Sequence, residues 1–191
     1  NIFGKDISKK VKKGFIDKDI LPLVKQINMH PNYYTTSSCA GRIMIIKPSK
    51  VKHEAKWLFS SHDYPNLEDI IETLNTLPKE TIWLRMEPPI LHIATRDMDS
   101  ADLLLKKANA AGFRRPSILS FKKRVIVEIM IPSKMDVPIS KQGKLIVDET
   151  YLKFLLEEAN KKLKESRKKI IKLTNLFWSN FMLGSNFIFE F

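Results

Sequence analysis

Apolar residues recur along the chain with helical spacing in some segments and with strand-like spacing in others. Helical spacing predicts helices over 20–27, 67–77, 99–111 and 149–177. Alternating or continuous apolar runs predict extended chain or strands over 33–38, 42–46, 56–60, 81–86, 90–95, 117–121 and 124–131, with a short strand at 145–147. Residues 132–144 lack a clear period and are expected to form a polar connection.

Residues with special backbone preferences indicate where these elements begin and end. Gly41 is expected to supply a tight turn, and Pro48 to end the strand that follows it. Asp99 or Ser100 can cap the helix over 99–111 at its N-terminus. Gly112 stands where a left-handed residue commonly ends a helix.

This mixture of elements predicts an α+β fold, with a mixed β-sheet flanked by helices in a single domain over 1–176. No G-x-G-x-x-G sequence follows a predicted strand, so a Rossmann-type fold is not expected. The tail over 177–191 holds five phenylalanines and one tryptophan with almost no charge. Such a tail would aggregate if exposed, so we expect it to dock on the domain or on a partner.

Net charge is the most informative property of the composition. The formal net charge is +12, with 33 lysines and arginines against 21 acidic residues. The stretch 106–124 holds seven basic residues and no acidic one. A field of this sign favours a polyanion, and RNA is the predicted partner. A lysine-rich surface kept for solubility or heat stability is the alternative.

Several chemistries lack the residues that they need. One cysteine allows no intramolecular disulfide and no cysteine-based zinc site, and it fits a reducing, cytoplasmic setting. The four histidines show no metal-ligand spacing, so no metal is predicted. No Gly-rich phosphate loop precedes a Lys-Ser or Lys-Thr pair. No apolar run approaches the roughly 20 residues that span a membrane.

The segment 35–42 concentrates groups that could bind a ligand. It places four hydroxyls, a thiol, a tight turn and the Arg42 guanidinium within eight residues. Hydroxyls and turn amides can hold a carboxylate or a phosphate, and Arg42 could form a bidentate pair with either. The alternative is a hydroxyl-rich hairpin turn in which Cys39 is a small buried residue.

A second candidate cluster lies on the predicted strand 81–86. Alternation sends Trp83 and Arg85 to one face of this strand. An indole beside a guanidinium suits stacking on a base together with pairing to a phosphate or carboxylate. Equally, Trp83 could belong to the core and Arg85 could form an internal ion pair with Glu87 or Glu128.

Two histidines are candidates for proton transfer. His92 lies on an apolar strand, where a structural histidine is the alternative. His62 follows Trp57 at a strand end, where the alternative is surface packing. An RNA nuclease that uses both histidines is possible, although their spacing does not argue for it.

The segments above also resemble a known family when they are taken together. The run from Tyr34 to Arg42, Tyr-Thr-Thr-Ser-Ser-Cys-Ala-Gly-Arg, resembles the S-x-S-S-C-x-G-R signature of the third wybutosine-synthesis protein family of tRNA modification. Thr35 replaces the first serine of the signature and keeps a hydroxyl. The resemblance continues in the same order through 57–62, 83–92, 108–113, 124–129, 137–139 and 151–160. It covers most of the chain from Asp17 to Leu173 and leaves out the aromatic tail.

The resemblance implies a methyltransferase that uses S-adenosylmethionine and lacks a Rossmann-type cofactor site. The implied substrate is the tricyclic guanosine derivative just 3′ of the anticodon of phenylalanine tRNA, methylated on a ring nitrogen. An anticodon loop is single-stranded, so its bases can be splayed out and stacked on aromatic rings. A non-catalytic RNA-binding or assembly protein remains the alternative.

The chemistry of the candidate residues, combined with this reaction, suggests a role for each as a hypothesis. The residues expected to bind the cofactor are Thr35, Ser37, Ser38 and Arg42. The residues expected to bind the base, phosphates or carboxylates of the RNA are Trp83, Arg85, Arg114, Arg115 and Arg124. His62 or His92 is expected to accept the departing proton.

Overall fold

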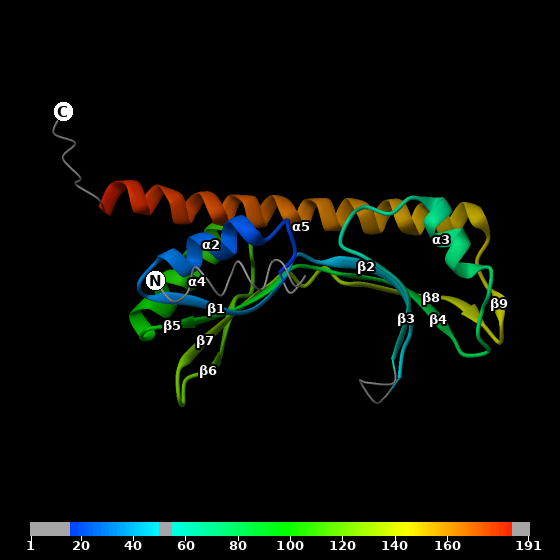
Figure 1. Ribbon diagram of the computed structural model, residues 1–191, viewed down its shortest axis with the longest axis horizontal. Coiled ribbons are helices and arrows are strands. Elements are labelled where there is room, and N and C mark those ends of the chain that lie inside the picture. The colour runs from blue at the N-terminus through cyan, green and yellow to red at the C-terminus, as the bar shows by residue number, and fades with distance from the viewer. Residues whose placement is uncertain (1–15, 50–54, 185–191) are drawn as a thin grey trace. The chain divides into compact units, whose positions relative to one another are not determined.

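The computed structural model describes residues 16–49 and 55–184, with side chains as far as Phe177 (Figure 1). The described residues form four helices and nine strands. Contacts divide the chain into two compact units. The first unit comprises Asn1–Ala40, Pro89–Ile131 and Arg167–Phe191, and the second comprises Gly41–Pro88 and Pro132–Ser166. That the residues 1–176 form one domain stays a prediction.

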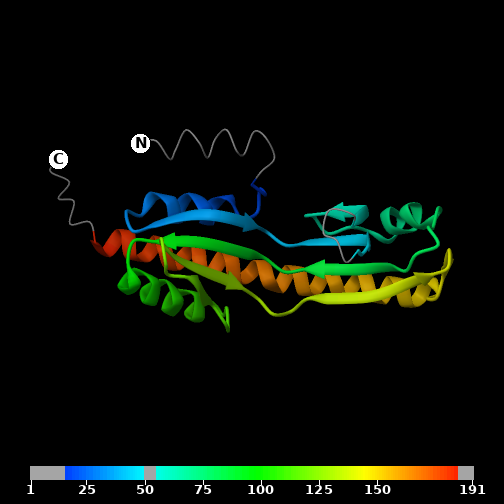
Figure 2. The ribbon, with the colours of Figure 1, turned by 90° about the horizontal axis from the view of Figure 1, so that it is seen from below.

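The first unit is a four-stranded antiparallel sheet with helices on one face (Figures 1 and 2). The sheet order is β1-β5-β7-β6. Its strands are β1 (Tyr33–Cys39), β5 (Ile90–Thr95), β6 (Ser117–Ser120) and β7 (Val125–Met130). Its helices are α2 (Leu21–Met29), α4 (Met98–Ala111) and the C-terminal part of α5 (Glu149–Gly184).

Alternation along β5 and β7 builds the core of the first unit. Leu91 and Ile93 on β5, with Val127 and Ile129 on β7, are fully buried. They belong to one cluster with apolar residues of the three helices, namely Leu23, Val24, Ile27, Ala101, Leu104, Ala108, Ile170, Leu173 and Phe177. The sheet therefore buries one face and leaves the other, which carries His92 and Glu128, partly exposed.

The second unit is a five-stranded antiparallel sheet in the order β3-β2-β4-β8-β9. Its strands are β2 (Arg42–Lys47), β3 (Lys56–Ser61), β4 (Ile82–Glu87), β8 (Met135–Lys141) and β9 (Lys144–Leu145). Its helices are α3 (Leu67–Leu74) and the N-terminal part of α5. Ile43, Ile45, Leu84 and Met86 face these helices and are fully buried.

Local signals explain where the helices begin and end. Asn66 and Asp69 form a reciprocal capping box at the start of α3, with the Asn66 Oδ1 atom 2.8 Å from the Asp69 amide. Asp97 caps α4, because its Oδ1 atom accepts the Ser100 amide at 2.8 Å. The prediction of Asp99 or Ser100 as the cap was therefore wrong by two or three residues. Gly112 has a φ of 96°, which confirms the predicted left-handed end of α4.

The α+β class is confirmed, and no nucleotide-binding parallel sheet is present among the described residues. The expectation of one mixed sheet was wrong, because every pairing of the described strands is antiparallel and the strands form two sheets. The polar connection predicted over 132–144 was also wrong, because it contains β8 and the first residue of β9. Pro138 obscured the pattern of β8, and a register shift at the opposite residue, Trp83, accommodates it.

The long C-terminal helix runs further than its apolar stripe predicted. Helix α5 continues to Gly184, so the first part of the predicted tail is helical. Phe177 is buried in the first unit, with its ring edge-on to Tyr33 at a centroid distance of 5.8 Å. Residues 185–191 and the side chains from 178 onward lie outside the described part, so docking of the tail stays a prediction. No helix in the described ranges is long and apolar enough to span a membrane.

Candidate functional site

The predicted site residues belong to both units, and each group is described within its own unit. The first unit holds Thr35, Ser37, Ser38, His92, Arg114, Arg115 and Arg124. The second unit holds Arg42, His62, Trp83 and Arg85.

Strand register in the first unit aligns four polar residues on the open face of the sheet. Ser37 lies opposite His92, His92 opposite Glu128, and Glu128 opposite Ser117. Directly opposite residues of antiparallel strands project to the same face of a sheet. The open face therefore carries a polar row that runs across all four strands.

A β-bulge in β1 separates the hydroxyls of the signature. The register shifts between Thr35 and Ser37, so Thr36 is the extra residue, and its hydroxyl donates to the carbonyl of His92 at 3.1 Å. Thr35 lies opposite the buried Ile93 and hence faces the helices. Its amide donates to Oδ1 of Asn28, and its hydroxyl oxygen accepts from Nδ2 of Asn28, both at 3.1 Å. Thr35 thus ties β1 to α2.

Ser38 also faces the helical side, because it lies opposite the buried Leu91. Of the three signature hydroxyls predicted to bind the cofactor, only that of Ser37 shares the open face with His92. The alternative of a hairpin turn was wrong as well, because β1 and β2 belong to different sheets. Gly41, which follows β1, has a φ of 82°, in the left-handed region that favours glycine. The predicted tight turn was nevertheless wrong, because Ala40 and Gly41 connect strands of two different sheets.

His92 is paired with a carboxylate on the open face. Its Nε2 atom lies 2.9 Å from Oε2 of Glu128, and the two side chains keep 31% and 22% of their surface exposed. A carboxylate oxygen accepts a hydrogen bond, so Nε2 carries a proton and Glu128 orients the ring. This leaves Nδ1 as the atom of a neutral ring that can accept a proton, and the arrangement suits a general base.

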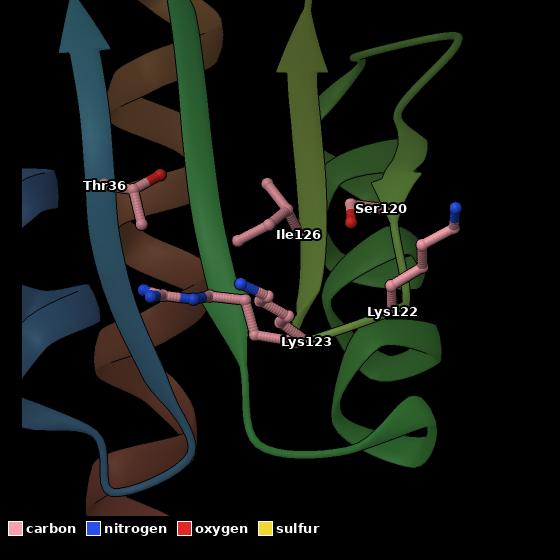
Figure 3. A pocket seen from close by; sticks show the side chains of 6 residues that line it. Thr36, Ser120, Lys122, Lys123 and Ile126 are labelled. Atoms are coloured by element: carbon pink, nitrogen blue, oxygen red, sulfur yellow. The ribbon is translucent and has the colours of Figure 1, made fainter.

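A positively charged hollow lies on the same unit. Its volume is about 450 Å³. The lining comes from β1, β6, β7 and the loop between β6 and β7, as Figure 3 shows, and consists of Thr36, Ser120, Lys122, Lys123, Arg124 and Ile126. Every ionisable group of the lining is a cation, so the hollow favours an anionic ligand.

The three arginines predicted to bind RNA in this unit differ in their surroundings. Arg124 lines the hollow, donates to the hydroxyl of Tyr34 and lies over the Tyr34 ring at 5.8 Å from its centroid. Arg114 and Arg115 are exposed in the connection between α4 and β6 and do not line the hollow. Only Arg124 therefore combines the predicted charge with a concave site.

Arg42 in the second unit is held by the protein's own side chains. Its Nε and Nη2 atoms lie 3.2 and 3.0 Å from Oε2 of Glu87. Its Cζ atom lies 4.4 Å from the ring centroid of Trp57, an indole that is 54% exposed. The guanidinium is thus positioned by a carboxylate and an aromatic face, and one carboxylate oxygen already takes two of its donors.

Within the first unit, the residues predicted to bind the cofactor consequently do not share one face of the sheet. Thr35 and Ser38 face the helices, and Arg42 is bound by Glu87. Of these three hydroxyl residues, only Ser37 lies on the open face of the sheet. Residues of the signature thus contribute to folding and orientation as well as to any ligand contact.

Arg85 forms the ion pair that was considered for it, but with a different partner. Its Nε and Nη2 atoms lie 3.0 and 2.8 Å from Oδ1 and Oδ2 of Asp136. Neither Glu87 nor Glu128 is the partner, because the register of β4 and β8 places Asp136 opposite Arg85. Partial burial raises the pKa of Asp136, but the hydrogen bonds and charges of Arg85 and Lys134 outweigh it and lower the pKa.

The predicted alternation of β4 is confirmed. Trp83 and Arg85 are half-buried on one face, and Leu84 and Met86 are buried on the other. Trp83 lies opposite Pro138 on one neighbouring strand and opposite Ile46 on the other. Its indole is therefore part of the sheet surface that Arg85 shares.

His62 has a defined proton position in the second unit. Its Nδ1 atom lies 2.9 Å from the carbonyl oxygen of Gly41. A carbonyl oxygen only accepts, so the proton lies on Nδ1. His62 therefore contacts the backbone of the signature at Gly41, whereas His92 has a carboxylate partner.

The sequence identified most of the candidate site residues, but it did not identify the side chains that pair with them. Glu87, Asp136 and the loop lysines Lys122 and Lys123 were not assigned to sites. Glu128 could have been recognised as a site residue, because it is an acidic residue within the otherwise apolar sequence of β7. The sequence of β8 held no comparable signal for Asp136, since this segment was not recognised as a strand.

Comparison with known proteins gives consistent matches over most of the chain. Residues 3–179 match the model of the family described as Methyltransferase TYW3. A relative from Methanocaldococcus jannaschii, named tRNA(Phe) 7-((3-amino-3-carboxypropyl)-4-demethylwyosine(37)-N(4))-methyltransferase, is 40% identical over 169 residues, which cover 86% of this chain and 88% of the relative. A relative of the same name from Thermococcus sibiricus is 36% identical, over 85% of this chain and 84% of the relative.

Two solved structures are similar to this chain in fold. The PH1069 protein from Pyrococcus horikoshii has a TM-score of 0.85 and 32% identity, over 92% of this chain and 90% of that protein. A hypothetical protein from Aeropyrum pernix has a TM-score of 0.74 and 27% identity, over 85% of this chain and 98% of that protein.

Proposed function

The chain belongs to the methyltransferase TYW3 family, and we propose that it methylates a ring nitrogen of the tricyclic wyosine precursor beside the anticodon of phenylalanine tRNA. The expected methyl donor is S-adenosylmethionine. The matched archaeal relatives are named for methylation at N(4) of such a precursor in tRNA(Phe). We further propose that the reaction takes place in the cytoplasm and needs neither a metal ion nor a membrane.

The observation that carries the mechanism is the pairing of His92 with Glu128. A ring nitrogen that gains a methyl group must lose its proton, and a positioned histidine can accept it. Glu128 holds Nε2 at 2.9 Å, so the ring presents Nδ1 as the accepting atom. The imidazolium that forms then lies beside a carboxylate that stabilises it.

Positioning supports the rest of the reaction. Methyl transfer is an in-line displacement, and holding the acceptor nitrogen close to the methyl carbon supplies much of the acceleration. Thr36 connects the two features that would do this, since it lines the cationic hollow and its hydroxyl donates to the backbone of His92. An RNA held in the hollow would thus have a base near the His92–Glu128 pair.

The test is methylation of undermodified phenylalanine tRNA with S-adenosylmethionine labelled in its methyl group, followed by nucleoside analysis. We expect label in the wyosine precursor and none in a transcript that carries an unmodified guanosine at that position. Binding of both RNAs without methyl transfer would instead indicate the non-catalytic RNA-binding protein, and cleaved RNA in the absence of cofactor would indicate a nuclease.

A further inference from the structure

The loop between β6 and β7 exposes apolar side chains next to cations. Phe121 is 75% exposed, the highest fraction among the large hydrophobic residues that the structure describes. Leu119, two residues before it, is 52% exposed. Lys122, Lys123 and Arg124 follow directly. Single exposed apolar residues are ordinary, but a ring and an aliphatic side chain beside three cations form a compact surface feature.

The hollow next to this loop has the lining of an anion site. Ser120 and Thr36 supply hydroxyls from two strands, and Ile126 supplies an apolar surface between them (Figure 3). Lys122, Lys123 and Arg124 supply the charge. The volume of about 450 Å³ lies within the range of pockets for small ligands, so a phosphate with part of its nucleotide can enter.

One cation of the hollow is fixed in place before any ligand arrives. Arg124 donates to the hydroxyl of Tyr34 and lies over its ring. Tyr34 and Ile126 share the open face, because both lie opposite Ala94. An arginine with a restrained guanidinium loses less freedom when it binds a phosphate than a freely moving lysine does.

We propose that the β6–β7 loop binds single-stranded RNA, with Phe121 stacked on an unpaired base and Lys122, Lys123 and Arg124 bound to the neighbouring phosphates. The proposal deepens the proposed function, since it rests on an RNA substrate and names the surface that holds it. An aromatic side chain beside a group of cations is a combination that recognises single strands, because every unpaired base has a stacking face and every phosphodiester carries a negative charge. A paired stem offers the phosphates but buries the faces of its bases.

The test uses the whole chain and a labelled anticodon stem-loop of phenylalanine tRNA without modifications, with affinity measured by fluorescence anisotropy. Phe121→Leu keeps an apolar side chain and removes the ring, and we expect roughly tenfold weaker binding. Phe121→Trp restores a ring and is expected to bind at least as tightly as the wild type. Thermal unfolding of each variant checks that the fold is intact.

Charge is tested with a matched pair of double variants. Lys122→Glu with Lys123→Glu removes two cations of the hollow and should weaken binding by on the order of a hundredfold at low salt. We expect the slope of log affinity against log salt to fall by about 1.4 in magnitude, because two phosphate contacts of a single strand are lost. Lys168→Glu with Lys172→Glu makes the same charge change at exposed positions of α5 in the same unit and should have a much smaller effect.

Two results of the RNA-binding measurements would overturn the proposal. One is wild-type affinity for the stem-loop in both Phe121→Leu and the hollow variant, and the other is equal losses in the hollow and α5 variants. The proposal would also be contradicted if the wild type bound anionic vesicles more tightly than RNA, and if Phe121→Leu abolished vesicle binding while it kept RNA binding. A wild-type chain that binds the RNA through this loop without methylating the tRNA would leave this proposal standing and refute the proposed reaction.

Discussion

His92 and Glu128 face each other across adjacent antiparallel strands, with Nε2 of the ring 2.9 Å from Oε2 of the carboxylate. Both side chains lie on the sheet face that the helices leave open. The residues before and after each of them on its strand are apolar and point into the core. His92 and Glu128 are therefore polar residues within two otherwise mostly apolar strands. Such a pair contributes little to packing and is well placed to exchange a proton with a ligand.

Substitution of this pair should separate catalysis from orientation. We expect His92→Asn to lower kcat at least a hundredfold, because it removes the proton acceptor. Glu128→Gln keeps the shape and removes the charge that stabilises the imidazolium, so we expect a loss of about tenfold in kcat with little change in KM for the tRNA. Initial rates of methyl transfer at several tRNA concentrations give kcat and KM for each variant and check both expectations.

The matched control is His62→Asn in the second unit, where the ring donates from Nδ1 to a carbonyl. We expect it to keep kcat within a few-fold of the wild type. A loss of kcat in His62→Asn together with full activity in His92→Asn would reverse the assignment of the two histidines.

Arg42 provides a second test, in the signature itself. Glu87 and Trp57 hold its guanidinium, so Arg42→Ala removes a positioned cation from a partly exposed surface. We expect methylation to fall at least tenfold while unfolding stays cooperative. The control Lys47→Ala breaks the pair with Glu80 at the other end of the same strand and should leave the rate unchanged. Equal rates in both variants would remove Arg42 from the site.

The Arg85–Asp136 pair predicts a stability loss in acid. Because the folded state lowers the pKa of Asp136, its contribution is present above the ordinary carboxyl pKa of 3.8 and disappears as the pH falls through the folded value. We expect the pair to contribute about 1 kcal/mol at pH 7. Urea unfolding of the wild type and Asp136→Asn at pH 7 and pH 3 checks this, and the difference between them should shrink in acid.

His30 predicts a pH dependence in a different range. Burial, and then the charge of Lys107, lower its pKa below the ordinary 6.5. Its Nδ1 atom also accepts the amide of Asn32 at 3.2 Å, which needs an unprotonated nitrogen. The folded state therefore binds fewer protons, and stability that is present above pH 6.5 is lost as the pH falls toward the folded pKa.

The measurement for His30 is the urea midpoint of the wild type and of His30→Gln between pH 7.5 and 5.5. The wild type should lose more stability over this range than the variant, since the variant has no group to protonate at this position. Parallel curves for the two proteins would show that His30 does not contribute to the pH dependence.

Gly112 tests the end of α4. With its φ of 96°, a side chain at this position is strained even though an added Cβ would meet only Lys169 side-chain atoms at 3.7 Å. We expect Gly112→Ala to lower the free energy of unfolding by about 1 kcal/mol and Gly112→Asn by less, because asparagine tolerates the left-handed region better. Urea unfolding of the wild type and the two variants measures these differences. Equal stability of all three proteins would contradict the role of Gly112 as the left-handed end of α4.

The positions of most elements follow from the sequence alone, because their signals are local. A period of two on residues 81–86 predicted that Trp83 and Arg85 share a face, and Gly112 marked a helix end. The ordered motifs from Tyr34 to Asn160 predicted the family that the comparisons support. Each of these signals depends on neighbours within a few residues, or on a series of motifs that needs no coordinates.

Partners and faces were decided by the tertiary structure. Arg42 binds Glu87 and Arg85 binds Asp136 across 45 and 51 residues of chain, and the register of strands, which local pattern does not encode, sets both pairs. The bulge at Thr36 turns Thr35 and Ser37 to opposite faces, although alternation alone would have kept them together. The sequence thus determines the chemical group of each side chain. The partner that this group contacts depends on which distant strands pair and in which register.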